Sequence, residues 1–551
     1  MPKAIATWGY SGSLTVLAAL LLSTGISRAE DASPAFIEAC RSVNQTGVPE
    51  GQVTQAQFNR EEVVAGSTVP AHCLIRGVMR ERKGTDGRSY ALNFELRLPV
   101  NWNQRFFFNG GGGVDGRLPS ATGTYSFGGR ATTPLQDGYA VVTHDGGHVA
   151  DYTNLQSNTT FLFGGEHQAR LMYGHEHIPL VAAAARQLIS AVYSEEPKFS
   201  YFVGCSNGGR QALMAAQRYP DLFDGIIANA PGFRLAQASI DGGIFRTQLA
   251  ASVAPRLEDG TPDWKNTLTS EEEGIVKSRI LAACDALDGA EDGMVSNWQQ
   301  CNPDPMDWVC TGSSTDCLSP EKASYVKNFT EGARTQDGKQ VYSRWHYDPG
   351  MVGEMGSPSP RARWIFAGES SHVYTTPPTI TSDIAGYALH ASLDEEFAKL
   401  FATTAEFPVS GAEFTNAESP DLDAFKAAGS KLFIMNGTAD WAFSFHDVVA
   451  YREAVAERYG EAETDAFMKI FAVPGMDHCR GGAYGTDHMD FMTPLVDWVE
   501  KGRETTEVMS EARAEAKVSW PGRTRPICAY PRQAFYKGEG DIEDGANFVC
   551  R

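Results

Sequence analysis

One serine lies in a sequence that is typical of a catalytic nucleophile. Gly204-Cys205-Ser206-Asn207-Gly208 has the pattern GxSxG, in which a serine sits on a tight turn between a strand and a helix. The apolar run 199–203 predicts the strand, and residues 208–218 predict the helix. At a helix N-terminus, free N–H groups and the helix dipole favour the negative charge that develops when a hydroxyl attacks a carbonyl. The alternative is a serine that only caps the helix.

A serine hydroxyl needs a general base, and the base needs a carboxylate that orients it. With this nucleophile pattern the acid and then the histidine follow the serine in chain order. Among twelve histidines, His478 follows the predicted strand 468–473, and Asp440 follows the predicted strand 431–436. Loops at the carboxyl ends of parallel strands are where ligands and catalysis gather. The sequence therefore predicts His478 and Asp440 as partners of the serine, with Asp447 as the weaker alternative acid.

Two cysteines flank the predicted nucleophile and base. Cys205 precedes Ser206, and Cys479 follows His478. A disulfide between them would hold their Cα atoms roughly 4.4–6.8 Å apart and so bring two distant parts of the chain together. The alternatives are two unrelated cysteines, or Cys205 itself as the nucleophile.

A serine nucleophile of this kind also needs two N–H donors for the developing oxyanion. The residue after the nucleophile, Asn207, is expected to supply one donor, and the glycine-rich loop 110–113 the other. Glycine lets the backbone approach a substrate closely. The alternative for such a run of glycines is a plain flexible turn.

Alternating strand and helix patterns surround these residues. Apolar and polar residues alternate over 92–98, and further apolar runs cover 105–108 and 139–143, while 178–193 reads as a helix. This order predicts an α/β protein with a parallel sheet. The pattern breaks after Pro231-Gly232 and resumes at Lys431. We therefore expect a catalytic domain formed by 30–232 and 431–551, with residues 233–430 inserted as a lid.

The N-terminus predicts export. Lys3, the apolar run 14–22 and the small residues around Arg28 match a signal peptide over residues 1–29. The apolar run is too short to span a membrane, although an N-terminal membrane anchor is the alternative. The formal net charge of −21 argues against nucleic acid and anionic membranes as partners. We expect a protein without a membrane anchor, in the periplasm or outside the cell.

Because we expect export, we also expect the ten cysteines to form disulfides, since an even number of cysteines in an oxidising compartment favours them. Without a CxxC pair, a zinc ribbon or a thioredoxin-like site is improbable. The sequence alone does not fix the connectivity. Natural local pairings are Cys284–Cys301, Cys310–Cys317 and Cys528–Cys550.

A short acidic segment in the expected lid has a metal-binding composition. Residues 284–294 contain three aspartates within eight positions, together with two glycines. Calcium takes six to eight oxygen ligands, and such a loop can supply carboxylates and backbone carbonyls together. The spacing is not that of an EF-hand, and the alternative is an ordinary turn rich in aspartate.

These motifs together resemble the tannase and feruloyl esterase family of secreted serine esterases. The resemblance extends from about Cys40 to Cys550, and it is carried by GCSNGGRQ at 204–211, NGGGGVDG at 109–116, CDALDGAEDGMV at 284–295, NGTADWAFS at 436–444 and VPGMDHCRGG at 473–482. It implies an α/β-hydrolase fold with a large lid, bound by disulfides and calcium.

The resemblance also implies roles for individual residues. It implies a triad of Ser206, Asp440 and His478 beside a Cys205–Cys479 bridge, with Gly113 and Asn207 as oxyanion donors. It implies Ca²⁺ in the lid and no organic cofactor. The implied calcium ligands are Asp285, Asp288 and Asp292 with the carbonyls of Ala290 and Met294, and the implied pairings add Cys40–Cys73 to the three local ones.

The substrate is less well defined. Trp364 and Phe443 resemble the aromatic clamp of a family member that hydrolyses mono(2-hydroxyethyl) terephthalate and whose lid also supplies an arginine for the free carboxylate. No arginine occurs here between Trp364 and Ser430. Either another residue, such as Arg361 or Arg363, takes that role, or the acyl group lacks a second carboxylate.

We expect a secreted serine carboxylester hydrolase that cleaves small aromatic esters, with feruloyl, galloyl or hydroxybenzoyl groups, through an acyl-enzyme. One alternative substrate is the terephthalate monoester. An alternative of another class is a catalytically silent binding protein on the same fold.

Overall fold

A ten-stranded mixed sheet forms the centre of the protein. The computed structural model describes residues 32–126, 129–154, 158–513 and 520–551, so the predicted signal peptide lies outside the described residues. The strands, in spatial order, are β1 (Gly47–Val48), β2 (Gly51–Asn59), β5 (His72–Lys83), β6 (Ser89–Pro99), β8 (Ala140–His144), β7 (Arg105–Asn109), β9 (Phe199–Cys205), β10 (Gly225–Asn229), β11 (Lys431–Gly437) and β12 (Met468–Val473).

The sheet has an antiparallel half and a parallel half. Neighbours from β1 to β8 run antiparallel, and neighbours from β8 to β12 run parallel. The strands predicted at 105–108, 139–143, 199–203, 431–436 and 468–473 form the parallel half, whereas the alternating segment 92–98 belongs to the antiparallel strand β6. In the parallel half, successive side chains point to opposite faces: Phe106 and Phe108 lie in one apolar cluster and Phe107 in another.

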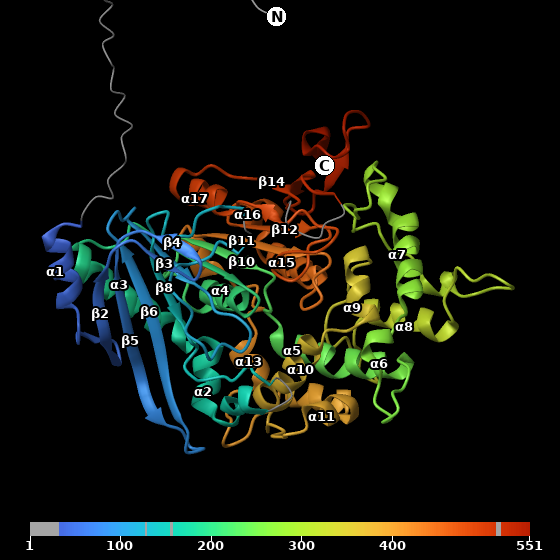
Figure 1. Ribbon diagram of the computed structural model, residues 1–551, viewed down its shortest axis with the longest axis horizontal. Coiled ribbons are helices and arrows are strands. Elements are labelled where there is room, and N and C mark those ends of the chain that lie inside the picture. The colour runs from blue at the N-terminus through green and yellow to red at the C-terminus, as the bar shows by residue number, and fades with distance from the viewer. Residues whose placement is uncertain (1–31, 127–128, 155–157, 514–519) are drawn as a thin grey trace, which may run out of the picture.

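Helices cover both faces of the parallel half. On one face, α3 (His177–Tyr193), α4 (Asn207–Arg218) and α15 (Phe445–Tyr459) contact the strands, and on the other face α17 (Met492–Lys501) packs on β10 and β11. Figure 1 shows these helices around the central strands, with the long antiparallel strands β2, β5 and β6 to one side. This is the α/β arrangement expected from the sequence.

The segment between β10 and β11 is mainly helical. Since Gly225 pairs with Lys431 on the adjacent parallel strand, the segment leaves and re-enters the sheet at neighbouring strands. We call residues 233–430 the insertion. Its helices are α5 (Leu235–Ile240), α6 (Arg246–Val253), α7 (Ser270–Cys284), α8 (Pro320–Glu331), α9 (Val352–Gly356), α10 (Pro360–Glu369), α11 (Ile384–His390), α12 (Leu393–Lys399), α13 (Gly411–Thr415) and α14 (Asp423–Ala427).

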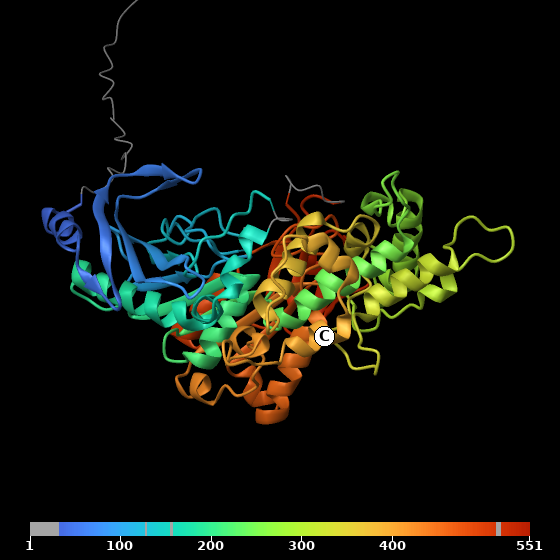
Figure 2. The same ribbon diagram turned by 90° about the horizontal axis from the view of Figure 1, so that it is seen from below.

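Part of the insertion and the antiparallel strands lie at opposite ends of the molecule. In Figures 1 and 2, α6, α7, α8 and α9 lie at the end away from β2 and β5. The C-terminal strands β14 (Glu507–Glu511) and β15 (Thr524–Cys528) continue toward the insertion. Arg523 donates a hydrogen bond of 2.7 Å to the carbonyl oxygen of Asp292, which joins the C-terminal region to the aspartate-rich loop.

Shorter elements complete the described fold: α1 (Pro34–Ser42), β3 (Glu62–Val64), β4 (Ser67–Val69), α2 (His167–Leu171), α16 (Glu461–Asp465), β13 (His488–Met489), β16 (Ala534–Tyr536) and β17 (Phe548–Cys550). Within the described part of the chain, we find no helix with the length and apolar character needed to cross a membrane.

Five disulfides join all ten cysteines. They are Cys40–Cys73, Cys205–Cys479, Cys284–Cys301, Cys310–Cys317 and Cys528–Cys550. These are the five pairings expected above, and no cysteine is free. Cys205 is therefore not available as a nucleophile. Disulfides persist in oxidising compartments, which agrees with the expected export.

Candidate active site

Ser206 occupies a strained turn between β9 and α4. Its backbone has φ 63° and ψ −124°, which is rare for a residue other than glycine. The turn requires the glycines around it. A Cβ at Gly204 would lie 2.4 Å from the backbone of Gly208, and a Cβ at Gly208 would lie 2.4 Å from the carbonyl oxygen of Gly111. The GxSxG pattern thus reflects a close approach of strand, helix and glycine loop.

A hydrogen-bonded chain joins this serine to a histidine and an aspartate. His478 Nε2 lies 2.9 Å from Ser206 Oγ, and His478 Nδ1 lies 3.0 Å from both carboxylate oxygens of Asp440. Asp440 is fully buried at its side chain, whereas the side chain of His478 is 17% exposed. A carboxylate on Nδ1 fixes the tautomer in which Nε2 can accept the serine proton.

The backbone after β11 holds the aspartate in place. The N–H groups of Ala442 and Phe443 donate to Asp440 Oδ1 at 2.7 and 3.2 Å. The alternative acid Asp447 is instead paired with Arg234 at 2.7 Å. Of the two acids, Asp440 is the one that contacts the histidine.

The Cys205–Cys479 disulfide lies beside this chain. Its Cα atoms are 5.9 Å apart. Asn229 at the end of β10 reinforces the link, because its backbone carbonyl accepts from Ser206 N at 3.0 Å and its side-chain amide donates to the carbonyl of Cys479 at 3.0 Å. One covalent bond and two hydrogen bonds therefore connect the serine turn with the histidine loop.

A buried carboxylate connects the glycine loop with helix α4. Asp115 Oδ1 accepts from Gly112 N at 3.0 Å and from the side chain of Asn207 at 2.7 Å. Its other oxygen accepts from Gln211 at 2.8 Å, and Gln211 in turn accepts from Gly111 N at 2.9 Å. These contacts fix the glycine loop against the N-terminus of α4.

The two residues expected as oxyanion donors both line one cavity with Ser206. Gly113 has φ +59°, and a Cβ there would lie 3.1 Å from the hydroxyl of Tyr152, so a larger residue would be strained. Asn207 is the first residue of α4, where the backbone N–H has no acceptor within the helix. The arrangement can present two N–H groups beside the serine hydroxyl.

Two buried histidines, His144 and His177, lie close to Asp115 in the interior of the protein. Possible ligand atoms of Asp115, His144 and His177 lie within 4.8 Å of one another. Burial lowers the pKa of His144 to about 3 and that of His177 well below its usual value, so both rings are neutral. Because the Asp115 oxygens already accept three hydrogen bonds, we interpret this group as interior support for the glycine loop.

The cavity at Ser206 has a volume of about 900 Å³, and several aromatic side chains line it. Its aromatic lining residues are Tyr152, Phe366, Trp441 and Phe443. The rings of Trp441 and Phe443 lie 5.3 and 5.5 Å from the ring of His478. A space of this size with such walls can hold a small aromatic acyl group beside the serine.

Of the two residues expected to form an aromatic clamp, Trp364 and Phe443, only one lines the cavity. Phe443 lines the cavity, but Trp364 is not among its lining residues. Trp364 packs with Ala367, Ile384 and Ala388 in a separate apolar cluster. Phe366, two positions later on α10, faces the cavity instead, with its ring centroid 6.0 Å from that of Phe443. In this structure Phe366 rather than Trp364 lines the cavity, and a role of Trp364 in substrate binding stays a prediction.

The arginines considered for a substrate carboxylate also differ in position. Arg363 is buried, donates to the carbonyl of Pro358 at 2.9 Å and lies over the ring of Trp264, away from the cavity lining. The side chain of Arg361 lies outside the described residues. Among the described lining residues, Arg117 is the one lysine or arginine, and it is an exposed side chain stacked on Tyr152.

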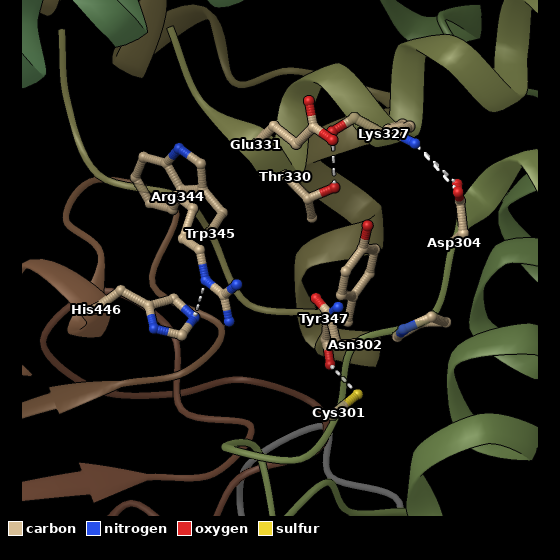
Figure 3. A pocket seen from close by; sticks show the side chains of 11 residues that line it. Cys301, Asn302, Asp304, Lys327, Thr330, Glu331, Arg344, Trp345, Tyr347 and His446 are labelled. Atoms are coloured by element: carbon tan, nitrogen blue, oxygen red, sulfur yellow. Dashed lines mark hydrogen bonds and ion pairs between the residues drawn. The ribbon is translucent and has the colours of Figure 1, made fainter. Parts of the chain in front are cut away.

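A second, smaller cavity shares no lining residue with the first. It has a volume of about 290 Å³ and is lined by insertion residues such as Lys327 and by His446 of α15 (Figure 3). Lys327 is paired with Asp304, and Arg344 with His446. No serine or cysteine thiol lines it, since Cys301 is in a disulfide. The chemistry expected from the sequence therefore lies in the larger cavity.

The aspartate-rich loop partly fits the calcium ion that the resemblance implies. Asp288 is fully buried, and its Oδ2 has no hydrogen-bond partner. Burial, with added repulsion from Asp292 and Asp285, raises the pKa of Asp288 to about 6. A cation would satisfy this carboxylate. However, Asp292 already contacts Arg525, and the three aspartates are not as tightly grouped as Asp115, His144 and His177 among the described residues.

Several cavity residues were not predicted from the sequence. Glu369 faces the cavity because it lies on α10 one helical turn after Ile365 and Phe366, a spacing that was available as a signal. Trp441 directly follows Asp440. Tyr152 has no such signal, since it comes from an irregular loop that only the tertiary fold brings to Gly113.

Comparison with known proteins identifies the family and agrees with the fold. Residues 76–551 match the family described as tannase and feruloyl esterase. The chain is 36% identical to mono(2-hydroxyethyl) terephthalate hydrolase from Piscinibacter sakaiensis over 523 residues, which are 88% of this chain and 86% of that protein. It is 30% identical to a probable feruloyl esterase from Arthroderma benhamiae, covering 83% and 81% of the two chains.

The fold also matches a solved structure. The crystal structure of feruloyl esterase B from Aspergillus oryzae superposes with a TM-score of 0.75 at 22% identity and covers 94% of this chain and 100% of that chain. The fold is therefore an α/β-hydrolase fold, and the protein is a carboxylic ester hydrolase. It belongs to the tannase and feruloyl esterase family. This sets aside the alternative of a catalytically silent binding protein.

Proposed function

We propose that Ser206, His478 and Asp440 form the catalytic triad of this esterase. The observation that carries the proposal is the continuous chain from Ser206 Oγ to His478 Nε2 and from Nδ1 to Asp440. His478 takes the serine proton while Oγ attacks the ester carbonyl carbon. Asp440 holds the ring and stabilises the imidazolium. The N–H groups of Asn207 and Gly113 stabilise the tetrahedral oxyanion.

The second half of the reaction uses the same groups. The intermediate collapses when the C–O bond to the alcohol breaks, and His478 gives its proton to the departing oxygen. The acid remains as an ester of Ser206. Water then attacks this ester with His478 as base, and the free acid leaves as Oγ recovers its proton.

For the acyl group, we propose a phenolic acid such as a feruloyl, galloyl or hydroxybenzoyl group. The aromatic side chains that line the cavity at Ser206 support the choice of an acyl group with an aromatic ring. Arg117 is the one lysine or arginine among the described lining residues, and the acidic side chains Asp115, Glu369 and Asp477 also line the cavity, which favours an uncharged ring over one that carries a carboxylate. The 36% identity to mono(2-hydroxyethyl) terephthalate hydrolase supports the terephthalate monoester as second candidate.

A substrate panel with the purified protein tests this proposal. We expect higher kcat/KM for methyl ferulate, methyl gallate and methyl 4-hydroxybenzoate than for mono(2-hydroxyethyl) terephthalate. Ser206→Ala should remain folded and lose on the order of 10⁴–10⁶ in kcat on every substrate. Faster hydrolysis of the terephthalate monoester would favour the second candidate, and near-wild-type turnover by Ser206→Ala would refute the triad.

We propose further that the protein is exported and that its aspartate-rich loop binds calcium. Five disulfides support export, as they form in oxidising compartments. Asp288 with its unpartnered oxygen, Asp285, Asp292 and the carbonyls of Ala290 and Met294 would hold the ion. A calcium ion there would neutralise buried carboxylates and stabilise the insertion.

A further inference from the structure

A buried carboxyl group lies in the wall of the substrate cavity and has no role in the triad. Glu369, the last residue of α10, is 2% exposed, and its Oε2 has no hydrogen-bond partner among the described residues. It shares the cavity-facing side of α10 with Ile365 and Phe366. A buried polar atom without a partner is costly unless another molecule satisfies it.

The surroundings of Glu369 keep its carboxyl group uncharged. Burial raises the pKa of Glu369 to about 8, although the hydroxyl of Tyr374 and the charge of Arg210 act in the opposite direction. Arg210 is already engaged, because it donates to Asn207 Oδ1 and to the carbonyl of Gly174, both at 2.7 Å. The hydroxyl of Tyr374 is also hydrogen-bonded to the hydroxyl of Tyr173, at 3.0 Å.

A neutral carboxyl group in an apolar wall is suited to one kind of ligand. Its C=O oxygen accepts a hydrogen bond, and its O–H donates one. A phenol offers the same two functions, and an adjacent methoxy or second hydroxyl oxygen offers a further acceptor. An unsubstituted ring leaves the carboxyl group unsatisfied, and a ring carboxylate would be desolvated beside an acid.

We propose that Glu369 is the specificity-determining residue for hydroxylated aromatic acyl groups, and that it receives the ring hydroxyl of the substrate. This inference rests on the proposed function, because it assumes that the acyl ring enters the cavity next to Ser206. Phe366, one helical turn before Glu369, and Phe443 line the same cavity, with ring centroids 6.0 Å apart, and would contact the substrate ring. The aromatic residues select a ring, and Glu369 selects its hydroxyl.

The test compares two esters that differ only in the ring hydroxyl. Methyl 3-(4-hydroxyphenyl)propanoate and methyl 3-phenylpropanoate are suitable, because two methylene groups separate the ring from the carbonyl and the hydroxyl does not change its reactivity. The ratio of their kcat/KM values is measured for the wild type, Glu369→Gln and Glu369→Leu. Glu354→Gln serves as a matched control, since Glu354 lies in the insertion with a pKa raised by burial to about 7 but does not line this cavity.

We expect the wild type to prefer the hydroxylated ester about 10- to 100-fold, the range that a hydrogen bond to a buried polar group gives. Glu369→Gln and Glu354→Gln should keep most of this preference. Glu369→Leu should lose it by slowing the hydroxylated ester, while the unsubstituted ester stays within a few-fold of wild type.

Two results would overturn the inference: a wild-type ratio near one, or an unchanged ratio in Glu369→Leu. If Glu369→Leu lacks the wild-type circular dichroism spectrum and is misfolded, the inference is still tested by the ratio of kcat/KM values that the wild type shows for the two esters. Failure of the proposed triad is a separate outcome, since it would appear as hydrolysis of both esters by Ser206→Ala.

Discussion

The triad depends on which carboxylate orients His478. Asp440 contacts both the imidazole and two backbone N–H groups, whereas Asp447 forms an ion pair with Arg234. Asp477 accepts a hydrogen bond from the backbone N–H of His478 at 2.6 Å and does not orient the ring. These contacts assign the three nearby acids to different tasks.

We predict that Asp440→Asn lowers kcat about 10⁴-fold, because an amide on Nδ1 favours the wrong histidine tautomer. Asp477→Asn should have a much smaller effect, as it removes no contact to the ring. Asp447→Asn should lower the melting temperature, since it leaves Arg234 without its buried partner. Steady-state kinetics on methyl ferulate measure the changes in kcat, and thermal unfolding measures the change in melting temperature. A larger kinetic loss in Asp447→Asn than in Asp440→Asn would contradict the assignment.

At the residue scale, the sequence predicted polar chemistry better than aromatic contacts. Ser206, Asp440 and His478 each follow a recognisable strand, and the GxSxG glycines are explained by close backbone contacts. Trp364 and Phe366 lie on the same helix two positions apart. Which of them faces the cavity depends on how α10 is rotated against the neighbouring helices of the insertion, such as α5 and α11, and local sequence does not encode that.

The glycine loop and α4 act as one element, because Asp115 accepts hydrogen bonds from both. The proposed oxyanion donors Gly113 and Asn207 are adjacent to the groups that Asp115 holds. Since the oxyanion contact matters most in the transition state, loosening this element should affect kcat more than KM.

We therefore predict that Asp115→Ala lowers kcat about 10²- to 10³-fold with little change in KM. Asp115→Asn, which can still accept one of the hydrogen bonds, should lose less. Asp145→Asn is a matched control: Asp145 is also buried with a raised pKa of about 6, but it accepts from Asn93 and Gly147 and not from α4. Equal kinetic effects at Asp115 and Asp145 would show that the network has only a structural role.

The Cys205–Cys479 disulfide links the serine turn with the histidine loop. Catalysis tolerates only about 0.5 Å of displacement between such groups. We predict that Cys205→Ala with Cys479→Ala lowers kcat far more than it raises KM. Cys310→Ala with Cys317→Ala is the control, since that disulfide lies in the insertion. Unchanged kcat in the first double variant would contradict this role.

Prediction of elements from sequence succeeded where the pattern is regular. The parallel strands appear as apolar runs with turn residues after them. The insertion gave no clear pattern because many of its helices are short and separated by loops: α9, α13 and α14 have only five residues each. Short helices of this kind are fixed by packing and capping, not by an apolar periodicity.

At the scale of the whole molecule, the insertion is attached to the C-terminal region through the aspartate-rich loop. Arg523 and Arg525 from the C-terminal region both contact Asp292. The loop therefore lies where two parts distant in sequence meet, and neither its contacts nor its burial could be predicted from composition.

We predict that removal of calcium with EGTA lowers the melting temperature and has little effect on kcat measured below the transition. The loss should be about 2.7 kcal/mol when free calcium was a hundredfold above its Kd. Asp288→Asn should remove the response to EGTA, whereas Asp259→Asn, an exposed aspartate of the insertion, should keep it. A melting temperature unaffected by EGTA, with no calcium by elemental analysis, would refute the site.

The nucleophile is the most direct point at which the proposed mechanism can be tested. The purified protein is treated with a fluorophosphonate, and the intact mass, the modified peptide and the residual activity are measured together. We predict one phosphonyl group per chain, on the peptide that contains Ser206, with activity lost in proportion to labelling and no label on Ser206→Ala. Labelling of a different residue, or full activity in protein labelled at Ser206, would contradict the mechanism.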